Sequence, residues 1–118
     1  MKKTELAVGV IGVGHLGKLH LENVINNKEV YCSGIYDIDK EKSKKISYEK
    51  GIKSHGSINE LLEYSDAIII AVPTSKHFAV AKECLSQKKN IFIEKPISKT
   101  LKEADELIKL SDNNNCFI

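Results

Sequence analysis

Three glycines of the chain, Gly12, Gly14 and Gly17, stand at the spacing Gly-x-Gly-x-x-Gly directly after an apolar run. In a dinucleotide-binding loop the first glycine permits a tight turn, the second lets backbone approach a pyrophosphate, and the third lets a helix pack closely on the strand. The phosphates then meet free amide groups at the start of the helix. Seven glycines in 118 residues can reach this spacing by chance, so the alternative is an ordinary glycine-rich turn. The other residues of the loop are Val13, His15 and Leu16.

A carboxylate follows the next apolar segment. Asp37 lies about 20 residues after the last glycine of the motif, the separation expected of an acid that binds the adenosine ribose. A carboxylate there repels a 2′-phosphate, which favours NAD over NADP unless Lys40 or Lys42 compensates. The alternative is that Asp37 or Asp39 caps the following helix, and Asp39 suits that role better because it directly precedes the helical stretch.

The segments that must position these residues alternate between strand-like and helix-like patterns. Strands are expected at about 5–11, 30–36, 52–54, 67–72, 90–94 and 116–118, the last as the start of a sixth strand. Helices are expected at 15–26, 40–50, 75–87 and 101–113, with a brief one after Ser57. Ser57 and Thr100 each open a capping box, and Gly51 stands where a left-handed helix cap is expected. This order predicts an α/β fold, a Rossmann doubly wound parallel sheet with helices on both faces and the ligand at the carboxyl ends of the strands.

The helical periodicity also predicts which side chains face the core. In the first helix these are Leu21, Val24 and Ile25, and in the helix over 75–87 they are Phe78, Ala81, Cys84 and Leu85. In the last helix they are Leu101, Ala104, Leu107, Ile108 and Ser111.

Composition describes an ordinary single domain. A net charge of +2, with lysines dispersed among glutamates, favours neither a nucleic-acid nor a membrane partner. The N-terminal apolar run is short and interrupted by glycines, so we expect no signal or anchor and a cytoplasmic protein. Cys32, Cys84 and Cys116 are widely spaced in apolar segments and are expected to be reduced core residues. No metal-binding spacing is present, and His20 and His55 have no evident partners.

Two further segments carry a resemblance to a known family. They are residues 71–77, Ala-Val-Pro-Thr-Ser-Lys-His, and the triplet Glu94-Lys95-Pro96. Together with the glycine motif and Tyr36-Asp37, they resemble the N-terminal half of the glucose-fructose oxidoreductase and inositol dehydrogenase family of NAD(P)-dependent sugar dehydrogenases. The resemblance covers residues 1–118, which would form one NAD(P)-binding Rossmann domain, and the Glu-Lys-Pro triplet is its most specific part.

The resemblance implies roles for the triplet. Lys95 would be the active-site lysine, placed beside the nicotinamide to transfer a proton, and Glu94 would contact the nicotinamide ribose. A lysine with an ordinary pKa of about 10.4 does this near neutrality only where burial and a nearby positive charge favour its neutral form. The resemblance also implies a cis peptide before Pro96. The alternative for Lys95 is an exposed lysine before a turn.

The same resemblance implies contacts from residues 71–77. Pro73 and Thr74 would line the path of the cofactor, and His77 would lie close to the nicotinamide ribose. For His77 the alternative is a solvated residue in the first turn of a helix. The remaining residues of this segment expected at the cofactor are Ala71 and Val72.

Members of the family have a second domain that is absent from this chain and supplies the substrate pocket and most of the oligomer interface. The expected function is therefore that of the cofactor-binding domain of an NAD-dependent oxidoreductase acting on a hydroxyl of a sugar, sugar nucleotide or polyol. We expect no efficient turnover from these residues alone, and self-association, as in a homo-oligomer, through the uncovered surfaces. The alternatives are a free-standing NAD-binding module and an NAD-dependent glycosidase of the same family.

Overall fold

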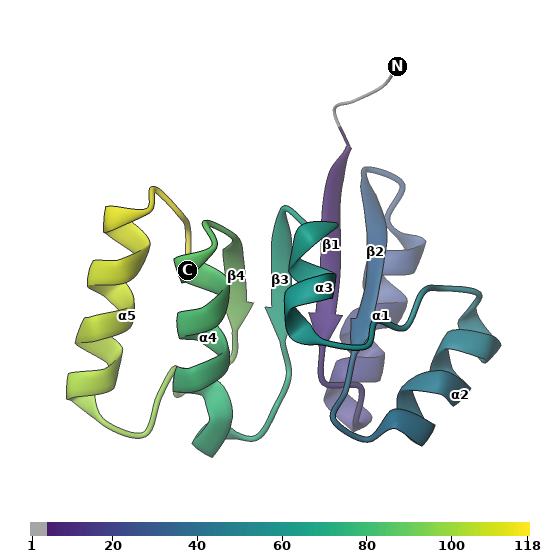
Figure 1. The fold of residues 1–118 in the computed structure, drawn as a ribbon, viewed down its shortest axis with the longest axis horizontal. Coiled ribbons are helices and arrows are strands. Elements are labelled where there is room, and N and C mark those ends of the chain that lie inside the picture. Colours follow the sequence, from purple (N-terminus) through teal and green to yellow (C-terminus); the bar gives the residue numbers. More distant parts are fainter. Residues whose placement is uncertain (1–4) are drawn as a thin grey trace.

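The computed structural model describes residues 5–118 as one parallel sheet flanked by helices (Figure 1). The strands are β1 (Leu6–Ile11), β2 (Val30–Tyr36), β3 (Ala67–Ile70) and β4 (Asn90–Ile93), in the spatial order β2-β1-β3-β4. The helices are α1 (His15–Asn26), α2 (Lys40–Lys50), α3 (Ile58–Glu63), the 3₁₀ helix η1 (Thr74–Lys76), α4 (His77–Ser86) and α5 (Leu101–Asn113). After β1, the chain forms β2 on one side of it and then β3 and β4 on the other side. The strand order therefore reverses between β1 and β3.

Helices cover both faces of the sheet, as the sequence predicts. In Figure 1, α3 and α4 lie in front of the sheet and α1 lies behind it. Each face has its own core because successive strand residues point to opposite sides. Val8 and Val10 of β1 pack with α1 and α2, whereas Ile68 and Ile70 of β3 pack with α3, α4 and α5. The predicted doubly wound α/β class is confirmed.

The register of the strands places all four carboxyl ends in one row. Ile11 pairs with Tyr36 on one side and with Ile70 on the other, and Ile70 pairs with Ile93. The residues that directly follow these four therefore start from the same edge of the sheet. They are Gly12, Asp37, Ala71 and Glu94.

The predicted helix ends follow from local capping. Asp39, Ser57 and Thr100 each accept a hydrogen bond from a backbone amide in the first turn of the helix that follows. Gly51 ends α2 in the left-handed conformation at φ 69°. The helices expected at about 15–26 and 40–50 and from 101 up to the turn at 113–115 are confirmed, whereas the one expected at about 75–87 is divided into η1 and α4.

Three strand predictions are wrong in part. The segment 52–54 forms only an isolated bridge between Ser54 and Ile35, in which the Ile35 amide donates to the Lys53 carbonyl and the His55 amide donates to the Ile35 carbonyl. The strand expected over 67–72 ends at Ile70, where the chain turns towards Pro73, which has no amide to donate. The sixth strand expected at 116–118 is not formed among the described residues; the Phe117 carbonyl accepts one hydrogen bond, from the Ile91 amide.

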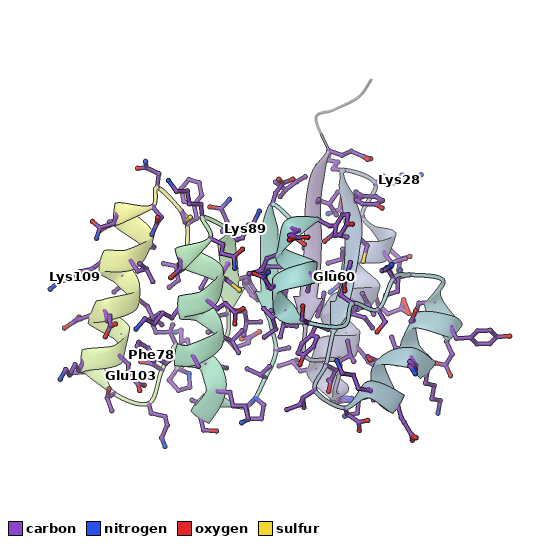
Figure 2. The ribbon with its side chains drawn as sticks, in the orientation of Figure 1. Lys28, Glu60, Phe78, Lys89, Glu103 and Lys109 are labelled. Atoms are coloured by element: carbon purple, nitrogen blue, oxygen red, sulfur yellow. The ribbon has the colours of Figure 1, made fainter. Side chains whose placement is uncertain are left out.

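The exposed fractions of the side chains show that part of the predicted core is wrong. Leu21, Val24, Ala81, Cys84, Leu85, Leu107 and Ser111 are buried as expected. By contrast, Leu101 is 84% exposed, Ile108 is 45% exposed and Ile25 is 37% exposed. The main neighbour of α5 is α4, and only Leu107 and Ser111 of this helix are buried, so α5 buries a narrower stripe than its periodicity suggests. Figure 2 shows Phe78 on α4 at the side that faces α5.

The three cysteines carry free thiols. Burial raises the pKa of the Cys84 thiol to about 12, which leaves it protonated in the core. Burial also raises the pKa of Cys32 and of Cys116. Among residues 5–118, no helix has the length and apolar content needed to cross a membrane.

Candidate functional site

A groove of about 620 Å³ opens at the point where the strand order reverses. Such switch points are where open α/β sheets bind ligands. Seven of the residues predicted to bind a cofactor line it: Gly12, Gly14, Leu16, Asp37, Ala71, Val72 and Pro73. Seven residues outside the predicted cofactor contacts also line it: Ile11, Tyr36, Ile38, Lys42, Ile58, Lys76 and Val80. Tyr36 and Ile38 flank Asp37, so their sequence position was the signal that could have identified them.

The three motif glycines have separable structural roles. Gly12 has φ +95°, and a Cβ there would lie 2.6 Å from the Ala71 carbonyl oxygen. A Cβ on Gly17 would lie 1.8 Å from the Gly12 carbonyl oxygen, so this glycine lets α1 pack against the loop. A Cβ on Gly14 would meet nothing within 4 Å. Gly12 and Gly17 are therefore required by the fold, whereas the space above Gly14 is open to a ligand.

The N-terminus of α1 has no side-chain cap. Gly14 occupies the N-cap position, and no side chain accepts from the first-turn amides. The first turns of α2, α3 and α5 each have such an acceptor. Amide groups without an intrahelical partner, at the positive end of a 12-residue helix, suit an anion. The residues present therefore fit the pyrophosphate of a dinucleotide.

Asp37 bridges the glycine loop and the segment that follows β2. One of its carboxylate oxygens accepts from the Val13 amide at 2.8 Å, and the other accepts from the Asp39 amide at 2.8 Å. Each oxygen keeps a further lone pair, which can accept from a ribose hydroxyl in the groove. The side chain that caps α2 belongs to Asp39, which accepts from the Lys42 amide at 3.1 Å.

The two lysines near Asp37 are placed differently. The Lys40 ammonium donates to the Gly56 carbonyl at 2.8 Å and lies 4.8 Å from the centre of the Tyr36 ring. The side chain of Lys42 lines the groove together with Asp37. Of the two, Lys42 is therefore the one that lines the groove with Asp37.

Glu94 and Lys95 follow β4, outside the lining of the groove, and both are exposed. The peptide bond between Lys95 and Pro96 is cis, as the resemblance implies. The Glu94 carboxylate lies 3.4 Å from Nε2 of His20 on α1, and the ring of His20 meets the Phe92 ring at 5.6 Å between centres. The sequence suggested no partner for His20 at a site, whereas the structure places it beside the predicted site residue Glu94. No local pattern could have revealed this pair, because it depends on β4 lying beside α1.

His77 is only 3% exposed, which excludes a solvated surface position. Its Nδ1 lies 3.0 Å from the Pro96 carbonyl oxygen, and its Nε2 lies 3.1 Å from the Val72 carbonyl oxygen. The ring therefore joins the segment after β3 to the turn after β4. Thr74, the neighbouring predicted contact, begins η1 and is half-buried.

The other two histidines lie apart from the groove. His55 is buried, with Nε2 at 3.0 Å from the Ser33 carbonyl oxygen, and it stabilises the fold. His15 is exposed on the outer side of the glycine loop. The Gly56 amide donates to the Glu60 carboxylate, labelled on α3 in Figure 2, and this bond, with His55 nearby, lowers the pKa of Glu60. In the part of the chain that the structure describes, no group of three or more side chains is arranged to hold a metal ion.

Comparison with known proteins gives one family match. The model of the GFO/IDH/MocA oxidoreductase family, described as an NAD-binding Rossmann fold, matches residues 6–118. UDP-N-acetylglucosamine 3-dehydrogenase of Acidithiobacillus ferrooxidans is 34% identical over 113 residues, which are 96% of this chain and 36% of that protein. Myo-inositol 2-dehydrogenase of Thermotoga maritima is 29% identical over 88% of this chain and 32% of its own length.

A solved structure agrees with the sequence comparison. The structure of the Acidithiobacillus ferrooxidans enzyme superposes with a TM-score of 0.91 at 32% identity and covers 97% of this chain and 37% of that one. The chain thus spans about a third of the length of these relatives.

Proposed function

Because this chain belongs to the GFO/IDH/MocA oxidoreductase family and has its NAD-binding Rossmann fold, we propose that the groove holds NAD with its pyrophosphate over Gly14. The observation that supports this most directly is the uncapped N-terminus of α1, which opens beside the carboxylate of Asp37. The first-turn amides bind the phosphates, and Asp37 accepts from the adenosine ribose.

The preference for NAD over NADP rests on the charges beside the ribose. Asp37 repels a 2′-phosphate, and Lys42 is the cation at the same place that would attract it. Because Asp37 also accepts from the Val13 amide, its carboxylate cannot move away from the groove without breaking this bond to the glycine loop. We therefore propose that NAD binds more tightly than NADP.

Calorimetric titration of the chain with NAD and, separately, with NADP tests both proposals. We expect saturable binding of each at one site, with NAD at least about tenfold tighter, equivalent to about 1.4 kcal/mol. Equal or reversed affinities would overturn the preference for NAD. No binding of either nucleotide would overturn the dinucleotide site itself.

For the complete enzyme we propose oxidation of a hydroxyl on a sugar nucleotide, sugar or polyol, the substrate classes in the names of the relatives. When bound, NAD supplies the hydride acceptor. Lys95 takes or returns the proton of the reacting hydroxyl, and Glu94, oriented by His20, accepts from the nicotinamide ribose. Thr74 and His77 lie on the segment that leads to this end of the groove.

We propose that residues 1–118 form only the cofactor domain and that a second domain supplies the substrate pocket. Lys95 is exposed here and lies outside the lining of the groove. We expect the chain, saturated with NAD, to give no measurable increase in reduced-nicotinamide absorbance with UDP-N-acetylglucosamine or myo-inositol. Sustained turnover with either compound would contradict the proposal.

Exposed apolar side chains also favour self-association. Leu19 of α1 and Phe92 of β4 are each 52% exposed. We propose that Phe92 lies in a contact between two copies of the chain. Light scattering should give a mass above that of one chain, and Phe92→Ser should lower it. Tyr48→Ser is the matched control, because the Tyr48 side chain on α2 is 90% exposed, and it should leave the measured mass unchanged. A monomer at high concentration would overturn this proposal.

The proposed compartment is the cytoplasm. The three thiols are free, and Cys84 is inaccessible in the core, which suits a reducing environment. The test is to isolate the protein without reductant, unfold it and count its free thiols. Three free thiols would agree with a reducing compartment, whereas fewer would indicate oxidation.

A further inference from the structure

One buried ring, that of His77, contacts two backbone carbonyls from separate parts of the proposed site. The Val72 carbonyl belongs to the segment that lines the groove after β3, and the Pro96 carbonyl belongs to the turn that carries Lys95. Both contacts are of normal hydrogen-bond length, at 3.1 and 3.0 Å. The two segments are 24 residues apart in sequence, and His77 bonds to both.

The chemistry of these partners sets a condition on the ring. A backbone carbonyl oxygen only accepts hydrogen bonds, and a neutral imidazole has one N–H donor. Both bonds can form together only when both ring nitrogens carry protons. If the ring carries one proton, only one of the two carbonyls receives a hydrogen bond from it. The His77 side chain is only 3% exposed, so leaving the other carbonyl without its donor is costly.

We propose that His77 is a positioning residue that fixes the Lys95 turn against the end of β3, and that this clamp is complete only when the ring is doubly protonated. The importance of this clamp for catalysis rests on the function proposed above, because the clamp aligns Lys95 with the groove. It assigns to His77 the placement of the reacting end of the site and no contact with the cofactor.

The charged side chains on the segments around His77 do not bond to its ring, so the two carbonyls are its direct partners. The turn carries Glu94, which pairs with His20, and the cation Lys95. The cation Lys76 precedes the ring in η1. On α4, Glu83 is half-buried and Lys82 pairs with Glu106 of α5 at 3.3 Å. Among residues 5–118 no carboxylate lies within 4.0 Å of either His77 nitrogen.

Long-range ¹H–¹⁵N correlation spectra of the chain, recorded from about pH 5.5 to about pH 9, test the clamp because the ring ¹⁵N shifts report the number of ring protons. We expect a doubly protonated His77 ring at the acidic end. Where it loses a proton, the amide signals of Lys95, Ile97 and Thr74 should shift with the same midpoint. A ring with one proton throughout, or turn signals that do not follow His77, would overturn the proposal.

Two further readings complete the test. A ring that keeps both protons over the whole range supports the clamp, since both carbonyls then hold their donors throughout. In His77→Gln, which has no titrating group, the coupled shift of the turn signals should be lost. If the same shift persists in that variant, another group causes it and the proposal fails. No measurement here uses a nucleotide, so failure of NAD binding and failure of the clamp are told apart.

Discussion

Gly17→Ala is expected to lower the free energy of unfolding of the chain by at least about 3 kcal/mol. The added Cβ would lie 1.8 Å from the carbonyl oxygen of Gly12 and 2.8 Å from its carbonyl carbon. Both atoms are backbone, so rotation of a side chain cannot relieve the clash. Either α1 moves away from the glycine loop or the loop opens, and each movement disturbs the core that Leu21 and Val24 form with the sheet.

Gly14→Ala is the matched control for this prediction. It makes the same chemical change three residues earlier, where a Cβ meets nothing within 4 Å. The free energy of unfolding of Gly14→Ala should stay within about 1 kcal/mol of that of the parent chain. Its affinity for NAD should fall, because the added methyl group occupies the phosphate side of the groove. Urea unfolding followed by circular dichroism measures both stabilities. Equal stability of the two variants would contradict the packing role assigned to Gly17.

Asp37→Ala is expected to weaken NAD binding by about 30-fold or more, equivalent to about 2 kcal/mol. The substitution removes the acceptor proposed for the ribose hydroxyls. It also removes the 2.8 Å bond to the Val13 amide, which holds the glycine loop beside the groove. The preference for NAD over NADP should shrink at the same time, because Lys42 then lies at the ribose position without the opposing carboxylate.

Asp39→Ala separates binding from stability at this place. Asp39 caps α2 through the Lys42 amide, so its loss should cost about 1 kcal/mol of unfolding free energy. It does not line the groove, and its NAD affinity should match that of the parent chain. Isothermal calorimetry gives the affinities and urea unfolding the stabilities. Weaker NAD binding in Asp39→Ala than in Asp37→Ala would show that the ribose acid had been misidentified.

Local signals explain where the sequence predicted the fold well. The N-caps Asp39 and Thr100 and the C-cap Gly51 act through bonds within a few residues, so α2 and α5 begin and end as predicted. The glycine motif likewise combines a strand, a turn and a helix within one short segment. Asp37 was found from its distance along the chain to that motif, and the structure places it 2.8 Å from the Val13 amide.

Interactions across the fold explain where prediction failed. Leu101 fits the periodicity of α5 but is 84% exposed, because α5 lies at the edge of the fold with α4 as its main neighbour. The segment 52–54, expected as a short and poor strand, forms a single bridge to β2. His20 acquires Glu94 as a partner only because the order of the strands brings the end of β4 beside α1.

The sequence by itself determined the class of fold, most of the helix boundaries and the family, because periodicity, caps and motifs are properties of short stretches of chain. The tertiary structure decided which residues meet at the site. It alone showed that His77 bonds to carbonyls of two segments, that Lys42 and not Lys40 lines the groove, and that Gly17 packs against Gly12. The physical reason is that these contacts join residues through the stacking of strands and helices, and no local pattern specifies which side chains that stacking brings together.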